Sequence, residues 1–228
     1  PETLKGIYKQ ARKDNTGHNV MVESMLNKED DLSFLEEENL TMTPNGALYT
    51  REKQGFLPRL MEQMYTDRVK YKKQMIQEEK KGSNADPNVI AHLHNLQLNL
   101  KIALNSAYGA LGNQWFRYYN ESNAEAVSVA GQLSIRWAER AVNDYLNGVL
   151  KTNGSDYVIA SDTDSLYVDL SPLVEKVGLE DTNKTIKFMD SVCDGKIQEV
   201  IDNCYEEMAG YVNAFQQKMV MKREVLAD

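Results

Sequence analysis

The chain has 228 residues, 42% of them hydrophobic and 26% charged, a composition typical of a globular protein with a substantial core. Its formal net charge of -8 argues against a free-standing nucleic-acid binder. No apolar run approaches the roughly 20 residues of a membrane span, so no membrane partner is expected. The two cysteines, eleven residues apart, indicate neither a disulfide framework nor a zinc site.

The beginning of the chain and its charge distribution add two expectations. The N-terminus shows neither an initiator Met nor a signal-peptide pattern, so we expect a piece of a larger protein. Residues 1–50 carry 5 Lys/Arg and 9 Asp/Glu, residues 51–81 carry 9 and 5, and residues 82–228 carry 12 and 20. A basic segment between two acidic ones suits a metal site paired with a polyanion-binding element, although it also arises by chance.

The first part of the chain is expected to be irregular. Residues 1–13 show the apolar spacing of a helix, and a polar stretch follows. Within residues 40–50, Asn45-Gly46 stands between two extended runs, which is a strong signal for two strands joined by a tight turn.

Two long helices are predicted next, at residues 56–81 and 88–112. Asp86 before Pro87 indicates an N-cap followed by proline at the first helical position. The short connection predicts an antiparallel pair, roughly 35–40 Å long at ~1.5 Å per residue. Five leucines are predicted to form the buried stripe of the second helix: Leu93, Leu96, Leu100, Leu104 and Leu111.

Each of these helices carries a polar face. Arg68 and Lys72 are four residues apart on the first helix, and Lys101, Asn105 and Tyr108 follow at i, i+4 and i+7 on the second. Taken alone, the face of Lys101, Asn105 and Tyr108 is more often a solvated flank than a binding surface.

The remaining elements define the fold class. An extended aromatic run at residues 115–119 precedes a third helix at residues 123–150, and strand-forming residues then flank the turn Ser-Asp-Thr-Asp-Ser at residues 161–165. A long helix at residues 186–217 and a strand at residues 219–225 follow. This order predicts an α+β fold, an antiparallel sheet with helices packed on one face.

The turn at residues 161–165 is the candidate metal site. Asp162 and Asp164 lie one residue apart on a rigid hairpin, and such carboxylates are suitable ligands for Mg²⁺, which takes oxygen ligands in a strict octahedron. An ordinary Asp-rich turn explains these residues equally well, so the hairpin alone leaves both interpretations open.

Two motifs together resemble one protein family. Lys101-Ile-Ala-Leu-Asn105-Ser-Ala-Tyr108-Gly109 resembles the fingers-helix motif Lys-x3-Asn-Ser-x-Tyr-Gly of family B DNA polymerases, and Asp162-Thr-Asp164-Ser resembles their palm motif. Further likeness to the replicative polymerases of T4-like bacteriophages lies in residues 112–119, 145–147 and 221–224. The family's first palm motif, Asp-x2-Ser-Leu-Tyr-Pro-Ser, is absent, as are its exonuclease and thumb domains. The resemblance therefore implies a fragment covering the fingers and most of the palm.

The resemblance implies three regions and a set of site residues. Residues 1–50 would form a palm insertion or entry segment, residues 51–112 the long antiparallel two-helix fingers hairpin, and residues 113–228 an antiparallel palm sheet with packed helices. Asp164, Asp162 and Lys101 would be catalytic, with Asp164, Asp162 and, less directly, Glu224 around two Mg²⁺ ions. The dNTP-binding residues would be Arg68, Lys72, Lys101, Asn105, Tyr108 and Gly109.

The implied activity is template-dependent transfer of dNTPs to a primer 3′ end, incomplete without the first palm motif. Its partners would be primer-template DNA, a dNTP, the remainder of the polymerase (exonuclease, rest of the palm, thumb) and a sliding clamp, in the cytoplasm of an infected bacterial host. Two alternatives stay open: a split-gene subunit or assembly module that works only with a complementary chain, and a magnesium protein of another kind with an acidic hairpin.

Overall fold

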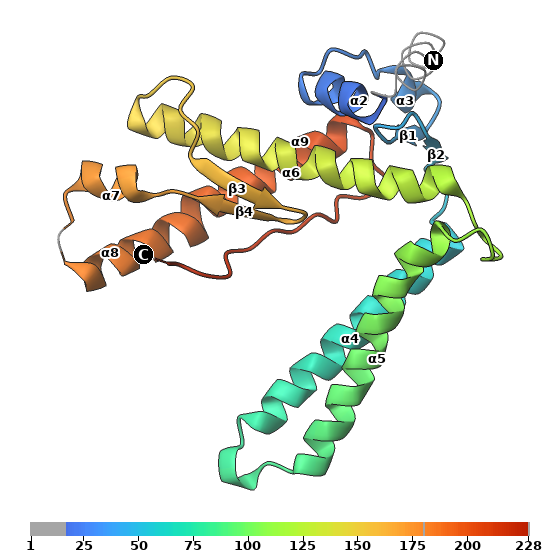
Figure 1. The fold of residues 1–228 in the computed structure, drawn as a ribbon, viewed down its shortest axis with the longest axis horizontal. Helices are drawn as coiled ribbons and strands as arrows, with labels where there is room; N and C mark the ends of the chain where they lie inside the picture. Colours follow the sequence, from blue (N-terminus) through green and yellow to red (C-terminus); the bar gives the residue numbers. More distant parts are fainter. Residues whose placement is uncertain (1–16, 180, 228) are drawn as a thin grey trace. The chain divides into compact units, whose positions relative to one another are not determined.

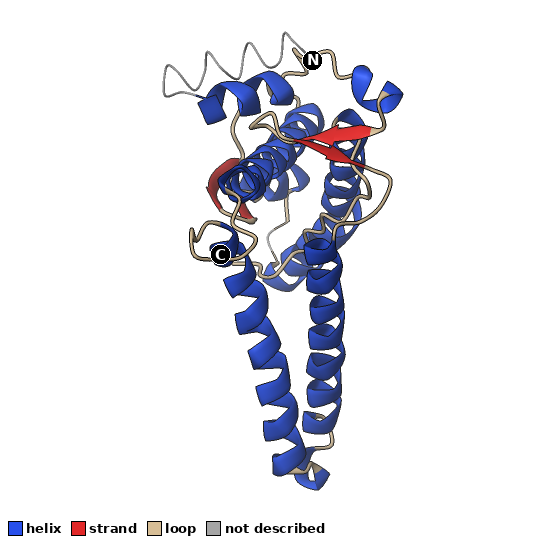
Figure 2. Cartoon of the chain, turned by 90° about the vertical axis from the view of Figure 1, so that its right-hand side faces the viewer, coloured by secondary structure: helices blue, strands red, loops and turns tan. Residues whose placement is uncertain are grey.

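The computed structural model describes residues 17–179 and 181–227, so the helix predicted at residues 1–13 lies outside the described residues. The chain divides into two compact units, residues 1–51 with 126–228 and residues 52–125. Helices dominate both, and the described residues also form two separate two-stranded antiparallel sheets (Figures 1 and 2). The α+β class is confirmed, although a single larger sheet with helices on one face is not found in the described part of the chain.

The first unit begins with helices α2 (Gly17–Leu26) and α3 (Phe34–Glu37), followed by strands β1 (Leu40–Met42) and β2 (Leu48–Thr50). The strands pair antiparallel with Leu40 opposite Thr50. Gly46 takes a positive φ of 77°, a conformation that glycine adopts without steric cost, and its N–H donates to the Thr43 carbonyl at 2.8 Å. The Asn-Gly turn predicted here is confirmed.

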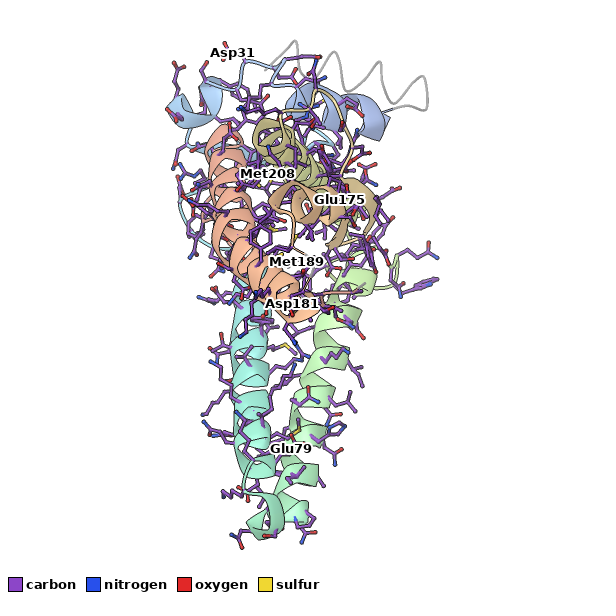
Figure 3. The ribbon with its side chains drawn as sticks, turned by 90° about the vertical axis from the view of Figure 1, so that its left-hand side faces the viewer. Asp31, Glu79, Glu175, Asp181, Met189 and Met208 are labelled. Atoms are coloured by element: carbon purple, nitrogen blue, oxygen red, sulfur yellow. The ribbon has the colours of Figure 1, made fainter. Side chains whose placement is uncertain are left out.

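The core of this unit is built around helix α6 (Glu121–Leu150). Against it pack the hairpin of β3 (Val158–Asp162) and β4 (Ser165–Val168), and the helical run of α8 (Thr182–Val192), η2 (Cys193–Ile197) and α9 (Gln198–Tyr211) (Figure 1). Helix α7 (Ser171–Val177) connects the hairpin to α8. Figure 3 labels Met189 on α8 and Met208 on α9, which both pack against the core. The buried positions of α6 include Val129, Leu133, Trp137, Val142 and Leu146.

The last part of the chain differs from the prediction in two ways. The helix begins earlier than residue 186, because the Asp181 side chain accepts from the Lys184 N–H at 2.8 Å and caps it. It ends at Tyr211 rather than residue 217: Asn213 adopts φ 49°, and its side-chain amide donates to the carbonyls of Leu35 and Leu40, both at 2.8 Å. The strand predicted at residues 219–225 is wrong, since this segment has no pairing strand among the described residues.

The second unit contains helix α4 (Phe56–Glu79), the short 3₁₀ helix η1 (Gly82–Asn84) and helix α5 (Pro87–Leu111), with α4 packed against α5. Asp86 caps α5, since its carboxylate accepts from the Asn88 N–H at 2.8 Å, and Pro87 takes the first helical position as predicted. The leucine stripe of α5 is only partly buried, because a helix pair covers only the side facing its partner. The buried residue of α5 is Gln97.

The aromatic run after α5 is turned rather than extended. The side chain of Asn113 accepts from the Trp115 N–H at 3.0 Å, and the Phe116 N–H donates to the Asn113 carbonyl at 2.9 Å. A hydrogen bond from the backbone N–H of one residue to the side chain of the residue two positions earlier favours a turn over an extended conformation. The ring of Tyr118 then packs edge-on against Phe56 at the start of α4, with ring centroids 4.8 Å apart.

Candidate functional site

Two asparagines of α6 fix the base of the β3–β4 hairpin. The Asn143 side-chain oxygen accepts from the N–H groups of Tyr157 and Val158 at 2.8 and 3.3 Å. One helical turn later, Asn147 exchanges two hydrogen bonds with the backbone of Ser155, at 2.8 and 3.0 Å. Because Asn143 satisfies two backbone donors and Asn147 satisfies both backbone groups of Ser155, the pair ties the entry of the hairpin to the longest helix of the core. The position of the hairpin is thus set by rigid elements.

The tip of the hairpin carries the two aspartates. Asp162 pairs with Ser165, which leaves Thr163 and Asp164 as the two turn residues. Thr163 has a φ of 50°, an uncommon conformation for a β-branched residue that costs on the order of 1–3 kcal/mol. The Asp164 N–H donates to the Asp162 carbonyl, and the Ser165 hydroxyl donates to the same carbonyl at 3.2 Å. This tight turn places both carboxylates at an exposed end of the sheet.

The carboxylates of this turn are suited to hold a hard cation. Thr163 donates to one oxygen of Asp162 at 3.0 Å. Within the described residues, no side chain pairs with Asp164 and no Lys or Arg pairs with either aspartate. Mg²⁺ takes oxygen ligands, and no described protein cation competes for these two carboxylates. No three His, Cys, Asp or Glu side chains come together as a metal site in residues 17–179 and 181–227.

The second unit presents the predicted dNTP-binding residues on its two long helices, α4 and α5: Arg68, Lys72, Lys101, Asn105, Tyr108 and Gly109. Lys101 and Asn105 are exposed on α5. Apart from the backbone of its own helix, a Cβ placed on Gly109 would meet no described atom within 4 Å. Arg68 differs from the others: its Nε is buried without a hydrogen-bond partner in the described part of the chain. A buried donor without an acceptor is costly, and an anionic oxygen would satisfy it.

Glu224, the other predicted carboxylate, is exposed on the segment after α9. Within the described residues it does not come together with Asp162 and Asp164 as a three-residue metal-binding group. The structure thus brings Asp162 and Asp164 together on one turn, while Glu224 stays a prediction from the resemblance.

Other features of the first unit do not compete with the hairpin as a site. Burial raises the pKa of Cys204 to about 12 and also raises the pKa of Cys193, so both thiols stay protonated near neutral pH and neither is an activated nucleophile. Two surface hollows of about 270 and 300 Å³ include neither Asp162 nor Asp164. None of the helices described here combines the length and apolar composition needed to cross a membrane.

Comparison with known proteins decides the family. The model of DNA polymerase family B matches residues 15–202, a range that includes both the Lys101–Gly109 motif and the aspartate hairpin. The chain belongs to DNA polymerase family B. Glu224 lies beyond the matched range, so the family match does not support the role expected for it.

Individual relatives also support membership of this polymerase family. The DNA-directed DNA polymerase of Escherichia phage RB69 is 44% identical over 134 residues, covering 58% of this chain and 15% of the relative. That of Enterobacteria phage T4 is 31% identical over an alignment of 275 residues, covering 100% of this chain and 29% of the relative. The DNA polymerase delta catalytic subunit of Candida albicans is 31% identical over 176 residues. The chain therefore spans less than a third of the length of these polymerases and is of the T4-like type.

Sequence reasoning missed the residues that support the hairpin. Asn143 and Asn147 stand four residues apart near the end of α6, just before an Asn-Gly turn and the aspartates. Polar amides at this spacing near the end of a helix could have indicated side chains that bind the returning backbone. The positive φ of Thr163 had no such signal, because threonine is not a residue that favours it.

Proposed function

We propose that the chain is part of a DNA-directed DNA polymerase, which transfers a deoxynucleotide to a primer 3′ end under the direction of a template. The observation that carries this proposal is the family match across both motifs, one of which forms an exposed, rigidly held turn with two cation-free carboxylates. The relatives are named for the same activity.

Asp164 is the proposed principal metal ligand, with Asp162 beside it in a supporting role. Their oxygen atoms fit Mg²⁺, and Glu224 is proposed as a further carboxylate. When bound, two Mg²⁺ ions supply Lewis-acid stabilisation to the attacking 3′ oxygen and to the leaving pyrophosphate. The contribution of the chain is to hold these carboxylates at the tip of a hairpin whose strands pack against the core, so that little reorganisation is needed during the reaction.

The residues of α4 and α5 are proposed to bind the incoming dNTP. Arg68, Lys72 and Lys101 would neutralise the triphosphate, and the buried Nε of Arg68 would gain the acceptor that it lacks. In the transfer, the primer 3′-hydroxyl loses its proton to water, and its oxygen forms a bond to the α-phosphorus while the bond between that phosphorus and the pyrophosphate oxygen breaks. Lys101 would donate a proton to that leaving oxygen.

Three further residues would position the substrate. Asn105 would donate a hydrogen bond to the triphosphate, and Tyr108 would pack beneath the nascent base pair. Gly109 would leave room for a close approach, since no described atom beyond the surrounding helix backbone lies within 4 Å of a Cβ placed there. The two-helix unit would close as a lid over the bound nucleotide. Primer-template DNA, the rest of the polymerase, a sliding clamp and a site of action in the cytoplasm of an infected bacterium are proposed on the same grounds.

Primer extension tests the proposal. We expect no extension by the chain alone, because the aspartate of the first palm motif is missing from its ligand set. Co-expression with a polypeptide that carries this motif should produce template-dependent extension, and changing the aspartate of that motif to Asn should remove it.

The same experiment separates the alternatives. Extension by the rigorously purified chain alone would contradict the need for a second carboxylate source. Stable binding to the complementary polypeptide without any extension would favour an assembly module.

A further inference from the structure

The segment after α9 is held on the helical run α8–η2–α9 at two points. The Gln198 side chain donates to the Met221 carbonyl at 2.9 Å, and the side chain of Met221 packs against the core. Two residues later, Arg223 contacts two carboxylates. These are the polar contacts from residues 219–227 to the helices in the described part of the chain.

Arg223 is bound in a fixed orientation. Its Nε and Nη2 reach the two oxygens of Asp194, each at 3.2 Å, and its Nη2 also lies 3.0 Å from an oxygen of Asp190. A guanidinium that meets one carboxylate with two parallel N–H groups fixes direction as well as distance, which a lysine ammonium cannot do. The Arg223 side chain is 28% exposed, less than either carboxylate partner.

The helix is built to receive this cation. Asp190 and Asp194 are four residues apart, so on a helix they share a face and repel each other unless a cation lies between them. Asp194 lies in a π-helical turn, η2, a rare element that is frequent at functional sites. The hydrogen bond to Asp194, together with the charges of both carboxylates, raises the pKa of Arg223 above its ordinary value.

The neighbour of this anchor is Glu224. Both Arg223 and the next residue, Glu224, are exposed, but among the described residues only the Arg223 side chain bonds to the helical run. We propose that Arg223 is a positioning residue: by binding Asp190 and Asp194 it holds residues 219–225 on the helical run and so presents the Glu224 carboxylate to the reaction centre. This inference rests on the proposed polymerase function for the role of Glu224, but the anchoring itself does not.

The anchoring is tested without any activity. We expect ¹⁵N heteronuclear NOE values at residues 219–225 to be those of an ordered backbone in the unmodified chain. They should fall to values typical of an unstructured tail in Arg223→Ala. In Arg223→Lys they should fall only in part, because lysine keeps the positive charge but cannot donate two parallel N–H groups to one carboxylate. Lys196→Ala is the matched control, since it removes an exposed ion pair with Glu199 at 3.2 Å on the same helical run without touching the segment.

The positioning role is tested by a double-mutant cycle in the complemented primer-extension assay. Arg223→Ala should lower kcat on the order of 10- to 100-fold, with the dNTP KM little changed. In a Glu224→Gln background the same substitution should cost no more than about twofold, because the group that it positions is already lost.

Each outcome bears on a separate claim. Unchanged NOE values in Arg223→Ala would overturn the inference whatever the enzyme does. The order of residues 219–225 could be lost in Arg223→Ala while the losses in kcat of the two single variants multiply in the double variant. In that case Arg223 would not act through Glu224, and the inference would also be overturned. Absence of extension by the unmodified complemented chain would refute the proposed function, while the NOE values would still decide the anchoring.

Discussion

Asp164→Asn is expected to abolish primer extension by the complemented chain, with a loss of at least about 10³-fold in kcat. The substitution keeps the size and shape of the side chain but removes the charge that would bind the metal ion. Asp164 makes no side-chain hydrogen bond or ion pair within residues 17–179 and 181–227, so no structural contact is lost. Single-turnover extension of a labelled primer measures the effect.

A control for the Asp164 variant lies at the other end of the same hairpin. Asp169 follows β4 and accepts from the Ser171 N–H at 2.9 Å, a bond that asparagine can also accept. Asp169→Asn should therefore retain extension within about twofold, and both variants should keep the melting temperature of the parent. Comparable extension by Asp164→Asn and the parent would rule out the metal-ligand role.

Arg68→Ala is expected to lower kcat/KM for the incoming dNTP by about 100-fold. The buried Nε of Arg68 has no partner in the described residues, so it makes no protein hydrogen bond there that binding of a triphosphate would have to replace. Arg68→Lys should recover only part of the loss, because an ammonium keeps the charge without the planar fork. Steady-state kinetics over a range of dNTP concentrations separate kcat from KM.

The control for Arg68 is on the same helix. Lys73 is exposed on α4 but, five residues from Arg68, it lies on a different face. Lys73→Ala should leave kcat/KM within about twofold. If Lys73→Ala and Arg68→Ala cost the same, the effect would reflect the general charge of α4 rather than a built phosphate contact.

The sequence predicted those features whose cause lies within a few residues. The helices α4, α5 and α6 follow from sustained apolar spacing, the start of α5 from Asp86 and Pro87, and the aspartate hairpin from strand formers around a polar turn. Each signal acts through local backbone bonds or one buried face, so a single sequence contains it.

Features set by distant contacts were not predictable in this way. The end of α9 depends on Asn213 reaching the carbonyls of Leu35 and Leu40, more than 170 residues earlier in the chain. The segment at residues 219–225 has the composition of a strand, but it is held by Arg223 and Gln198 instead of a neighbouring strand. In the candidate site, the two aspartates themselves indicated metal binding. The support from Asn143 and the strained backbone of Thr163 depend on the three-dimensional structure and could not be predicted.

Binding of Mn²⁺, followed by electron paramagnetic resonance, tests most directly whether the hairpin is part of a shared metal site. We expect the chain alone to bind Mn²⁺ only loosely, and the complementary polypeptide with the first palm motif to tighten binding at least about tenfold by adding a carboxylate. Asp164→Asn should remove that gain. Tight binding by the chain alone, or a gain that survives Asp164→Asn, would contradict the account.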